Sequence, residues 1–155
     1  MSFSTTEAGV TRIRNADPDD GKLLPKERDT FLLLSGPNHN LFGERDPKTY
    51  GSTTLAQIEQ RVTELGKELG VKVYGGIIMN PGAFCHDSYS VRDAISGIDT
   101  PVFEIHISNI EAREEFRKSK TAAVCKAGCL FGAGVYGYEL ALRGAVAYAK
   151  ANPVA

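Results

Sequence analysis

Short apolar runs that stop at turn residues are the first pattern along the chain. Residues 31–35 are apolar up to Ser35 and are followed by Gly-Pro-Asn, as in a strand buried within a parallel sheet. Residues 102–107, in which Glu104 and His106 alternate with apolar residues, are also predicted to be strand. Two further short stretches, 71–74 and 77–80, flank a pair of glycines and are also predicted to be strand.

Helical spacing is clearest in residues 54–69. Thr54 and Gln57 fit a capping box at the start of this segment, and Gly70 fits its end. The apolar positions recur three and four residues apart, at Leu55, Ile58, Val62, Leu65 and Leu69. Helices are also predicted at about 88–96, at 111–117 after a capping Asn109, and in a glycine-rich region at 124–149. Alternating strands and helices predict an α/β fold with a mostly parallel sheet and helices on both faces.

The 155 residues suit one domain. Residues 1–29 lack apolar periodicity and are predicted to be a mobile N-terminal tail, with a processed or tethering segment as the alternative. Residues 30–150 are predicted to form a single α/β domain, and residues 151–155 a C-terminal tail.

The overall charge is close to balanced, with 18 basic and 19 acidic residues and a net charge of −1. This argues against nucleic acid or an anionic membrane as the main partner, and a small acidic substrate would need a local basic pocket. Three scattered cysteines indicate a reducing compartment, so the cytoplasm is expected. No apolar run approaches the length of a membrane span.

Three predicted strands each end in a polar cluster that contains a histidine. The clusters are Gly36-Pro37-Asn38-His39-Asn40, Asn80-Pro81-Gly82-Ala83-Phe84-Cys85-His86 and Glu104-Ile105-His106-Ile107-Ser108-Asn109. Ligands bind outside the carboxyl ends of parallel strands, so these clusters indicate an active site. The alternative is that each cluster only turns the chain and caps the next helix.

Basic residues near these clusters offer further chemistry. Tyrosine is a poor base in water, with a pKa near 10, but a guanidinium such as that of Arg45 favours the ionised form of a nearby Tyr50. A loop tyrosine that only packs is the alternative. Arg113 and Arg117 are spaced to share a helix face and to bind a carboxylate, or else to pair with the neighbouring glutamates.

Several other patterns are interpreted as structural. The segment Gly132–Gly137 matches a dinucleotide-binding pattern, but no convincing strand precedes it and only 18 residues follow it. Cys125 and Cys129 are interpreted as packing residues. Cys85 and His86 are adjacent in sequence, and neighbours in sequence rarely form a catalytic dyad, so they are not interpreted as one. Three histidines without paired-ligand spacing predict no metal site.

Taken together and in this order, the clusters resemble type II 3-dehydroquinase. The similar stretches are GPNHNLFGERDPKTYGSTTL from Gly36, IIMNPGAFCHDS from Ile77, PVFEIHISNIEAREEFR from Pro101 and GAGVYGYELAL from Gly132. The resemblance implies a flavodoxin-like fold, assembly into trimers or dodecamers, and no cofactor. It also implies the dehydration of 3-dehydroquinate to 3-dehydroshikimate by anti elimination through an enolate, in the shikimate pathway of aromatic amino acid biosynthesis or in quinate metabolism.

The resemblance also assigns roles by position. It implies that Tyr50 is the base, His106 the acid that protonates the departing hydroxyl, and Glu104 the carboxylate that orients this histidine. Arg45 matches the residue that activates the tyrosine, and Asn38 a residue that holds a water at the enolate oxygen. The positions matching substrate-binding residues are Asn80, His86, Asp93 (from a neighbouring subunit), Ile107, Ser108, Arg113 (on a lid) and Arg117.

One departure from the family is large. The family has a strand, a loop and a helix between the positions of Tyr74 and Gly75, and they are missing here. Parallel strands need a crossover of a dozen or more residues, so 71–74 and 77–80 are predicted to form one strand, with a hairpin as the alternative. The fold is therefore expected to be reduced by one strand and one helix, with part of one sheet face uncovered.

Smaller departures are His39 at a usually apolar position, Asp46 for a glutamate, and Lys118-Ser119-Lys120 for a histidine-rich segment. The missing segment supports a rival hypothesis, a truncated, non-catalytic protein that only binds a ligand or partner. A nucleotide-binding flavodoxin-like module is a third hypothesis, disfavoured because no phosphate loop follows the first strand.

Overall fold

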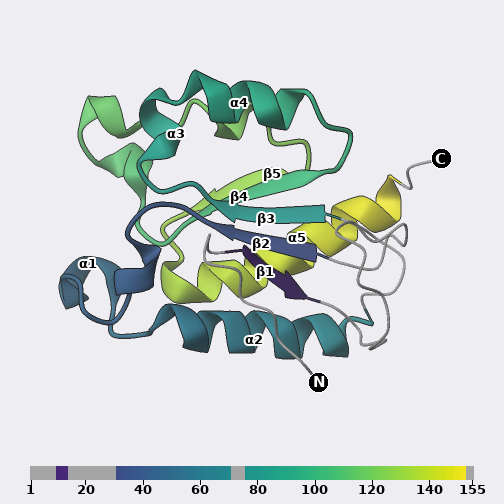
Figure 1. Ribbon diagram of the computed structural model, residues 1–155, viewed down its shortest axis with the longest axis horizontal. Helices are drawn as coiled ribbons and strands as arrows, with labels where there is room; N and C mark the ends of the chain where they lie inside the picture. The colour runs from purple at the N-terminus through teal and green to yellow at the C-terminus, as the bar shows by residue number, and fades with distance from the viewer. Residues whose placement is uncertain (1–9, 14–30, 71–75, 153–155) are drawn as a thin grey trace.

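A five-stranded sheet forms the centre of the molecule (Figure 1). The computed structural model describes residues 10–13, 31–70 and 76–152. The sheet order follows the chain, and β1 is antiparallel to β2 while β2 to β5 are parallel. The strands are β1 (Val10–Ile13), β2 (Phe31–Ser35), β3 (Gly76–Asn80), β4 (Val102–His106) and β5 (Gly128–Phe131).

Helices cover both faces of this sheet. The α-helices are α1 (Pro47–Tyr50), α2 (Leu55–Glu68), α3 (Phe84–Asp87), α4 (Tyr89–Ser96) and α5 (Gly137–Ala151). Short 3-10 turns are η1 (His39–Leu41), η2 (Ile110–Ala112), η3 (Glu115–Arg117), η4 (Ala122–Val124) and η5 (Gly134–Tyr136). Helices α2 and α5 lie below the sheet in Figure 1, and α3 and α4 lie above it. This arrangement confirms the predicted α/β class.

Helix α2 begins and ends as its sequence predicts. The Thr54 hydroxyl accepts a hydrogen bond from the Gln57 backbone N–H, and the Gln57 side chain accepts one from the Thr54 backbone N–H. These two bonds satisfy donors that the first turn of a helix leaves free. Gly70, just beyond the helix, has a φ of 58°, a conformation that glycine adopts at little cost. The helix buries Ile58, Val62 and Leu65 against α5 and the sheet.

Two hydrophobic clusters lie on opposite faces of the sheet. The larger one joins alternate residues of β2 to β4, namely Phe31, Leu33, Ile78 and Ile105, to α2 and α5. Each of these side chains is at most 1% exposed, and burial of one such side chain stabilises the fold by about 1.5–3 kcal/mol. The smaller cluster contains Met79, Ile95, Val102 and Cys125.

The face opposite α2 and α5 is less well covered near β2. Leu32, Leu34 and Ile77 alternate with buried residues of β2 and β3, yet they are only half-buried. This agrees with the expectation that the missing helix leaves part of one face uncovered. Strands β2 and β3 pair directly in parallel, with α2 in the connection between them. Of the predicted fused strand, only 76–80 is described, because residues 71–75 lie outside the described parts.

Three sequence-based predictions need correction. The region 124–149 is not helical throughout, because Gly128–Phe131 forms strand β5. This strand has only four residues and begins at a glycine, so its sequence shows no recognisable strand pattern. The predicted helix 111–117 is replaced by turns η2 and η3, although Asn109 does cap η2 by accepting from the Glu111 N–H. Within the predicted N-terminal tail, Val10–Ile13 forms strand β1, which pairs with β2. The domain boundaries otherwise stay a prediction.

In the described parts of the chain, every helix is too short or too polar to cross a membrane.

Candidate active site

The polar ends of β2 and β3 meet at one edge of the sheet. Ser35 and Asn80 are register partners, and the Gly36 N–H donates to the Asn80 carbonyl over 2.7 Å. A Cβ atom on Gly36 would lie 2.3 Å from the Pro81 carbonyl oxygen. Only glycine allows this approach, so the loops that follow the two strands are in direct contact.

A buried histidine–glutamate pair lies at the end of β4. His106 Nε2 and Glu104 Oε1 are 2.8 Å apart, and the two residues are 5% and 0% exposed. Both side chains point to the same side of the sheet, because residues two apart in a strand share a face. A carboxylate bonded to one ring nitrogen fixes the orientation of the imidazole. The pair therefore has the form of an oriented acid–base group.

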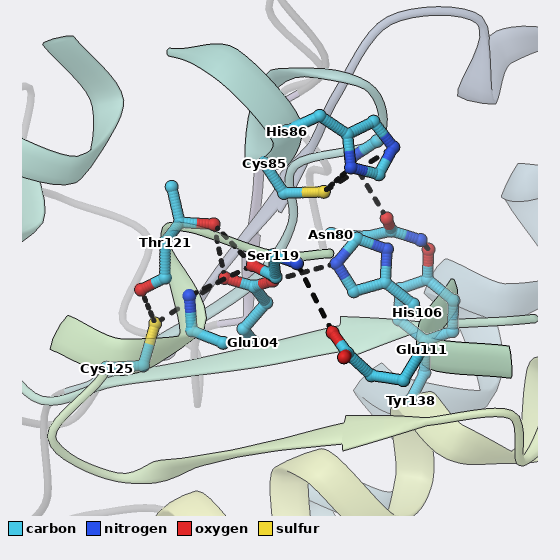
Figure 2. A network of polar contacts seen from close by, with 12 residues as sticks. Asn80, Cys85, His86, Glu104, His106, Glu111, Ser119, Thr121, Cys125 and Tyr138 are labelled. Carbon is cyan, nitrogen blue, oxygen red and sulfur yellow. Dashed lines mark hydrogen bonds and ion pairs between the residues drawn. The ribbon is translucent and has the colours of Figure 1, made fainter. Parts of the chain in front are cut away.

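Hydroxyl groups from the segment after η3 hold the Glu104 carboxylate, as Figure 2 shows. Ser119 donates to Oε1 and Thr121 to Oε2, each over 2.6 Å, and Cys125 Sγ lies 3.8 Å from Oε2. Burial by itself would raise the pKa of Glu104, but the hydrogen bonds from His106, Ser119 and Thr121 outweigh it and lower that pKa. The carboxylate is therefore held ionised beside His106.

Replacing Thr121 by valine tests this arrangement. Thr121 is fully buried, and the substitution keeps its shape while removing a donor to a charged group. The free energy of unfolding should fall by about 1–3 kcal/mol, because Oε2 would lose a donor that water does not replace. Thr121→Ser keeps the hydroxyl and should recover most of the loss. Equal stability of the valine variant and the wild type in urea unfolding would contradict this account.

Asn80 is fixed by two hydrogen bonds at the end of β3. Its Nδ2 donates to the Tyr138 hydroxyl over 2.7 Å, and its Oδ1 accepts from the Gly82 N–H over 3.2 Å. Tyr138 lies on α5 and is fully buried, and this burial raises the pKa of its phenol. Tyr138 thus stays neutral and holds the amide of Asn80 in one orientation.

Arg45 and Tyr50 lie together in the loop that follows β2. Arg45 Nη2 donates to the Tyr50 hydroxyl over 3.5 Å, and the guanidinium carbon lies 4.3 Å from the centre of the tyrosine ring. Helix α1 brings the two together, with Asp46 as its cap and Pro47 in its first turn. A guanidinium in this place can stabilise negative charge on the phenolic oxygen.

His39 lies in the same loop, in η1. Its ring stacks on Phe42, 4.7 Å between centroids, and Phe42 in turn lies 6.3 Å from the Tyr50 ring. Burial, helped by repulsion from Arg45 and His106, lowers the pKa of His39 to about 4. His39 is therefore a neutral imidazole near pH 7.

The remaining predicted residues lie around these groups. Asn38 is exposed and has a φ of 66°, Ile107 is buried, and Ser108 is half-buried. His86 is half-buried in α3, and Asp93 is exposed on α4. Arg113 and Arg117 do not share a helix face as predicted. Instead both approach Glu114, with Nε–Oε2 distances of 3.6 and 2.7 Å, as in the alternative interpretation of their spacing.

Some site residues were not predicted. Ser119, Thr121 and Tyr138 carry no motif of their own, and only the fold brings them to Glu104 and Asn80. The glycine-rich segment at 132–137 does follow a strand, β5, and precedes α5, so that part of the argument against nucleotide binding was wrong. Cys85 Sγ and His86 Nδ1 lie 3.1 Å apart, so the two side chains do contact each other although they were interpreted as no dyad, and burial raises the pKa of the thiol to about 12.

Among the described residues, one group has the proximity that a metal ion needs. Cys85, Glu104 and His106 offer ligand atoms that all lie within 4.8 Å of one another.

The fold and the site together define a class: an α/β enzyme whose buried histidine–carboxylate pair and arginine–tyrosine loop supply acid–base chemistry at the carboxyl edge of a parallel sheet. The family model described as dehydroquinase class II matches residues 29–75 and 72–146. The chain belongs to the class II dehydroquinase family and is a hydro-lyase.

Individual relatives agree with this membership. A 3-dehydroquinate dehydratase from Anoxybacillus flavithermus is 48% identical over 72% of this chain and 90% of its own length. The catabolic 3-dehydroquinase 2 of Neosartorya fischeri is 41% identical over 76% of this chain and 92% of its own length. The crystal structure of the type II dehydroquinase from Propionibacterium acnes matches with a TM-score of 0.66 and 36% identity over 72% of this chain and 91% of that one.

The same matches agree that a segment present in the family is absent from this chain. The two stretches matched by the family model meet at residues 72–75. The alignment with the Anoxybacillus relative spans 133 positions but covers 72% of 155 residues, about 112, which leaves about 21 positions without a counterpart here.

Proposed function

We propose that this protein dehydrates 3-dehydroquinate to 3-dehydroshikimate by anti elimination through an enolate. The names of its relatives support this substrate. The observation that carries the proposal is the buried His106–Glu104 pair at the end of β4, at the carboxyl edge of the sheet from which the Arg45–Tyr50 loop also leaves. The reaction needs no cofactor.

Each step follows from these groups. Tyr50, as a phenolate, removes the proton beside the ketone, and the Arg45 guanidinium stabilises the phenolate before the transfer. The electrons of the broken C–H bond form the enolate, and a water held by Asn38 stabilises the enolate oxygen. The enolate then expels the hydroxyl group, which takes a proton from His106 and leaves as water. Glu104 holds the imidazole from which that proton comes in one orientation.

The remaining residues bind the substrate. Asn80, His86, Ser108 and the backbone of Ile107 form hydrogen bonds to its hydroxyl and carboxylate groups. Arg117 pairs with the carboxylate, and Arg113 covers the site. For this, both arginines must turn from Glu114, an exposed contact that costs little to break.

The oligomeric state and the cellular compartment are also part of the proposal. Asp93 is exposed on α4, where it pairs with Arg92 over 3.5 Å, and it is proposed to approach a neighbouring copy in a trimer or dodecamer. The protein is proposed to act in the cytoplasm on a small-molecule substrate, without nucleic acid or membrane partners. The missing segment favours one alternative function, a truncated dehydroquinase-like protein that binds a ligand or partner without turnover.

Turnover of the purified protein separates the two functions. With 3-dehydroquinate, the wild type should produce the enone, seen as rising ultraviolet absorbance. His106→Ala should lower kcat by about 10²–10⁴-fold, the usual contribution of a general acid. Lys118→Ala, which removes an exposed lysine paired with Glu115, should keep full activity. A well-folded wild-type protein without turnover would establish the alternative.

A further inference from the structure

Cys85 is a buried thiol for which the dehydration has no use. It lies on α3, is 0% exposed, and lies above the histidine–glutamate pair in Figure 2. Its Sγ, one Glu104 carboxylate oxygen and one His106 ring nitrogen lie within 4.8 Å of one another. A second imidazole is also near, because His86 Nδ1 lies 3.1 Å from Cys85 Sγ.

This set of atoms suits one kind of metal ion. Zn²⁺ prefers thiolate, imidazole and carboxylate ligands at about 2.0–2.3 Å in a tetrahedron, whereas Mg²⁺ and Ca²⁺ prefer oxygen ligands alone. In such a tetrahedron the ligand atoms lie about 3.3–3.8 Å apart. The observed separations of up to 4.8 Å therefore close around an ion with side-chain movements of about 1 Å.

We propose that the site binds Zn²⁺ through Cys85, Glu104 and His106, with His86 as the fourth ligand, and that the bound ion inhibits the enzyme. The ion replaces two protons, one from the Cys85 thiol and one from the nitrogen of His106 that faces Glu104. Inhibition follows because the ion takes the nitrogen that Glu104 holds, so that the His106 ring leaves the orientation in which it protonates the leaving hydroxyl. The binding stands by itself, and only the inhibition rests on the proposed function.

Charge and support in the site favour a divalent ion. A thiolate and a carboxylate together neutralise Zn²⁺, so that no net charge is buried. Ser119 and Thr121 already hold the Glu104 carboxylate in place through hydrogen bonds, as groups that orient metal ligands do. His86 is half-exposed and gives the ion a way in from solvent.

Cadmium absorption tests the binding directly. A thiolate bound to Cd²⁺ absorbs in the ultraviolet, and titration of the purified protein should give one such band per chain, which added Zn²⁺ abolishes. Cys85→Ser should remove the band. Cys125→Ser and Cys129→Ser are matched controls, one buried and one exposed, and should keep it. No band in the wild type, or a band that disappears with Cys125 instead, would overturn the proposal.

Variants of the other ligands keep the test decisive if Cys85→Ser does not fold. His86→Ala and His106→Ala should each weaken Cd²⁺ binding by more than about tenfold. Removal of a residue that only supports a metal ligand already costs about tenfold in affinity, and removal of a ligand should cost more. Unchanged affinity in both variants would refute the site. The inhibition is measured as the ratio of turnover with and without Zn²⁺, which should be below one in the wild type and return toward one in Cys85→Ser. A protein without turnover would end the proposed function but leave the cadmium result to decide the site.

Discussion

Tyr50→Phe should lower kcat for 3-dehydroquinate by about 10²–10⁴-fold and change the fold little. The substitution removes only the hydroxyl that Arg45 contacts over 3.5 Å, and the ring keeps its stacking on the guanidinium and its place beside Phe42. Without the phenolic oxygen, no base is left to remove the proton beside the ketone. The measurement is steady-state kinetics by ultraviolet absorbance, with circular dichroism to check the fold.

Tyr136→Phe is the matched control for this variant. Tyr136 is 52% exposed, and the same loss of a hydroxyl there should leave kcat within about twofold of the wild type. If Tyr50→Phe retained full activity, another group would be the base and the proposed mechanism would be wrong. Loss of activity in Tyr50→Phe together with loss of structure would not support it either, so the circular dichroism spectrum must match the wild type.

His39→Leu should remove a large part of the protein's sensitivity to acid. The pKa of His39 is lowered from 6.5 to about 4 in the folded protein, chiefly by burial. As the pH falls below 6.5, the unfolded chain takes up this proton before the folded chain does. The free energy of unfolding therefore has its full value above pH 6.5 and decreases by about 2–3 kcal/mol as the pH falls toward 4.

Urea unfolding at several pH values between about 7 and 4.5 measures this effect. The loss of stability on acidification should be smaller in His39→Leu than in the wild type by about 2 kcal/mol. His39→Gln, which is polar but does not titrate in this range, should show the same flattened pH dependence. That control separates the charge of His39 from its packing against Phe42. Parallel pH curves for all three proteins would contradict the prediction.

Most of the fold follows from patterns within single segments. Helix α2 needs only its apolar spacing and the Thr54–Gln57 cap, and β2 and β3 are short, mostly apolar runs that stop at turn residues. The elements that were predicted wrongly also have local causes. Strand β5 is short and begins at a glycine, so its register with β4 depends on the neighbouring strand rather than on its own pattern. Segment 110–117 has helical spacing, yet its chain turns twice and brings Arg113 and Arg117 to Glu114.

The sequence by itself determined the class of fold, the three polar strand ends and the residues that belong to the family, because each depends on residues close together in the chain. Only the tertiary structure brought Ser119 and Thr121 to Glu104, Tyr138 to Asn80, and Cys85 to His106. These contacts join segments that are distant in sequence. A single serine, threonine or cysteine forms no repeating pattern in the sequence, so its hydrogen-bond partner cannot be predicted from it. The physical reason is that a buried charge takes its hydrogen bonds from whatever donors the packing places beside it, and the packing is decided by the whole sheet.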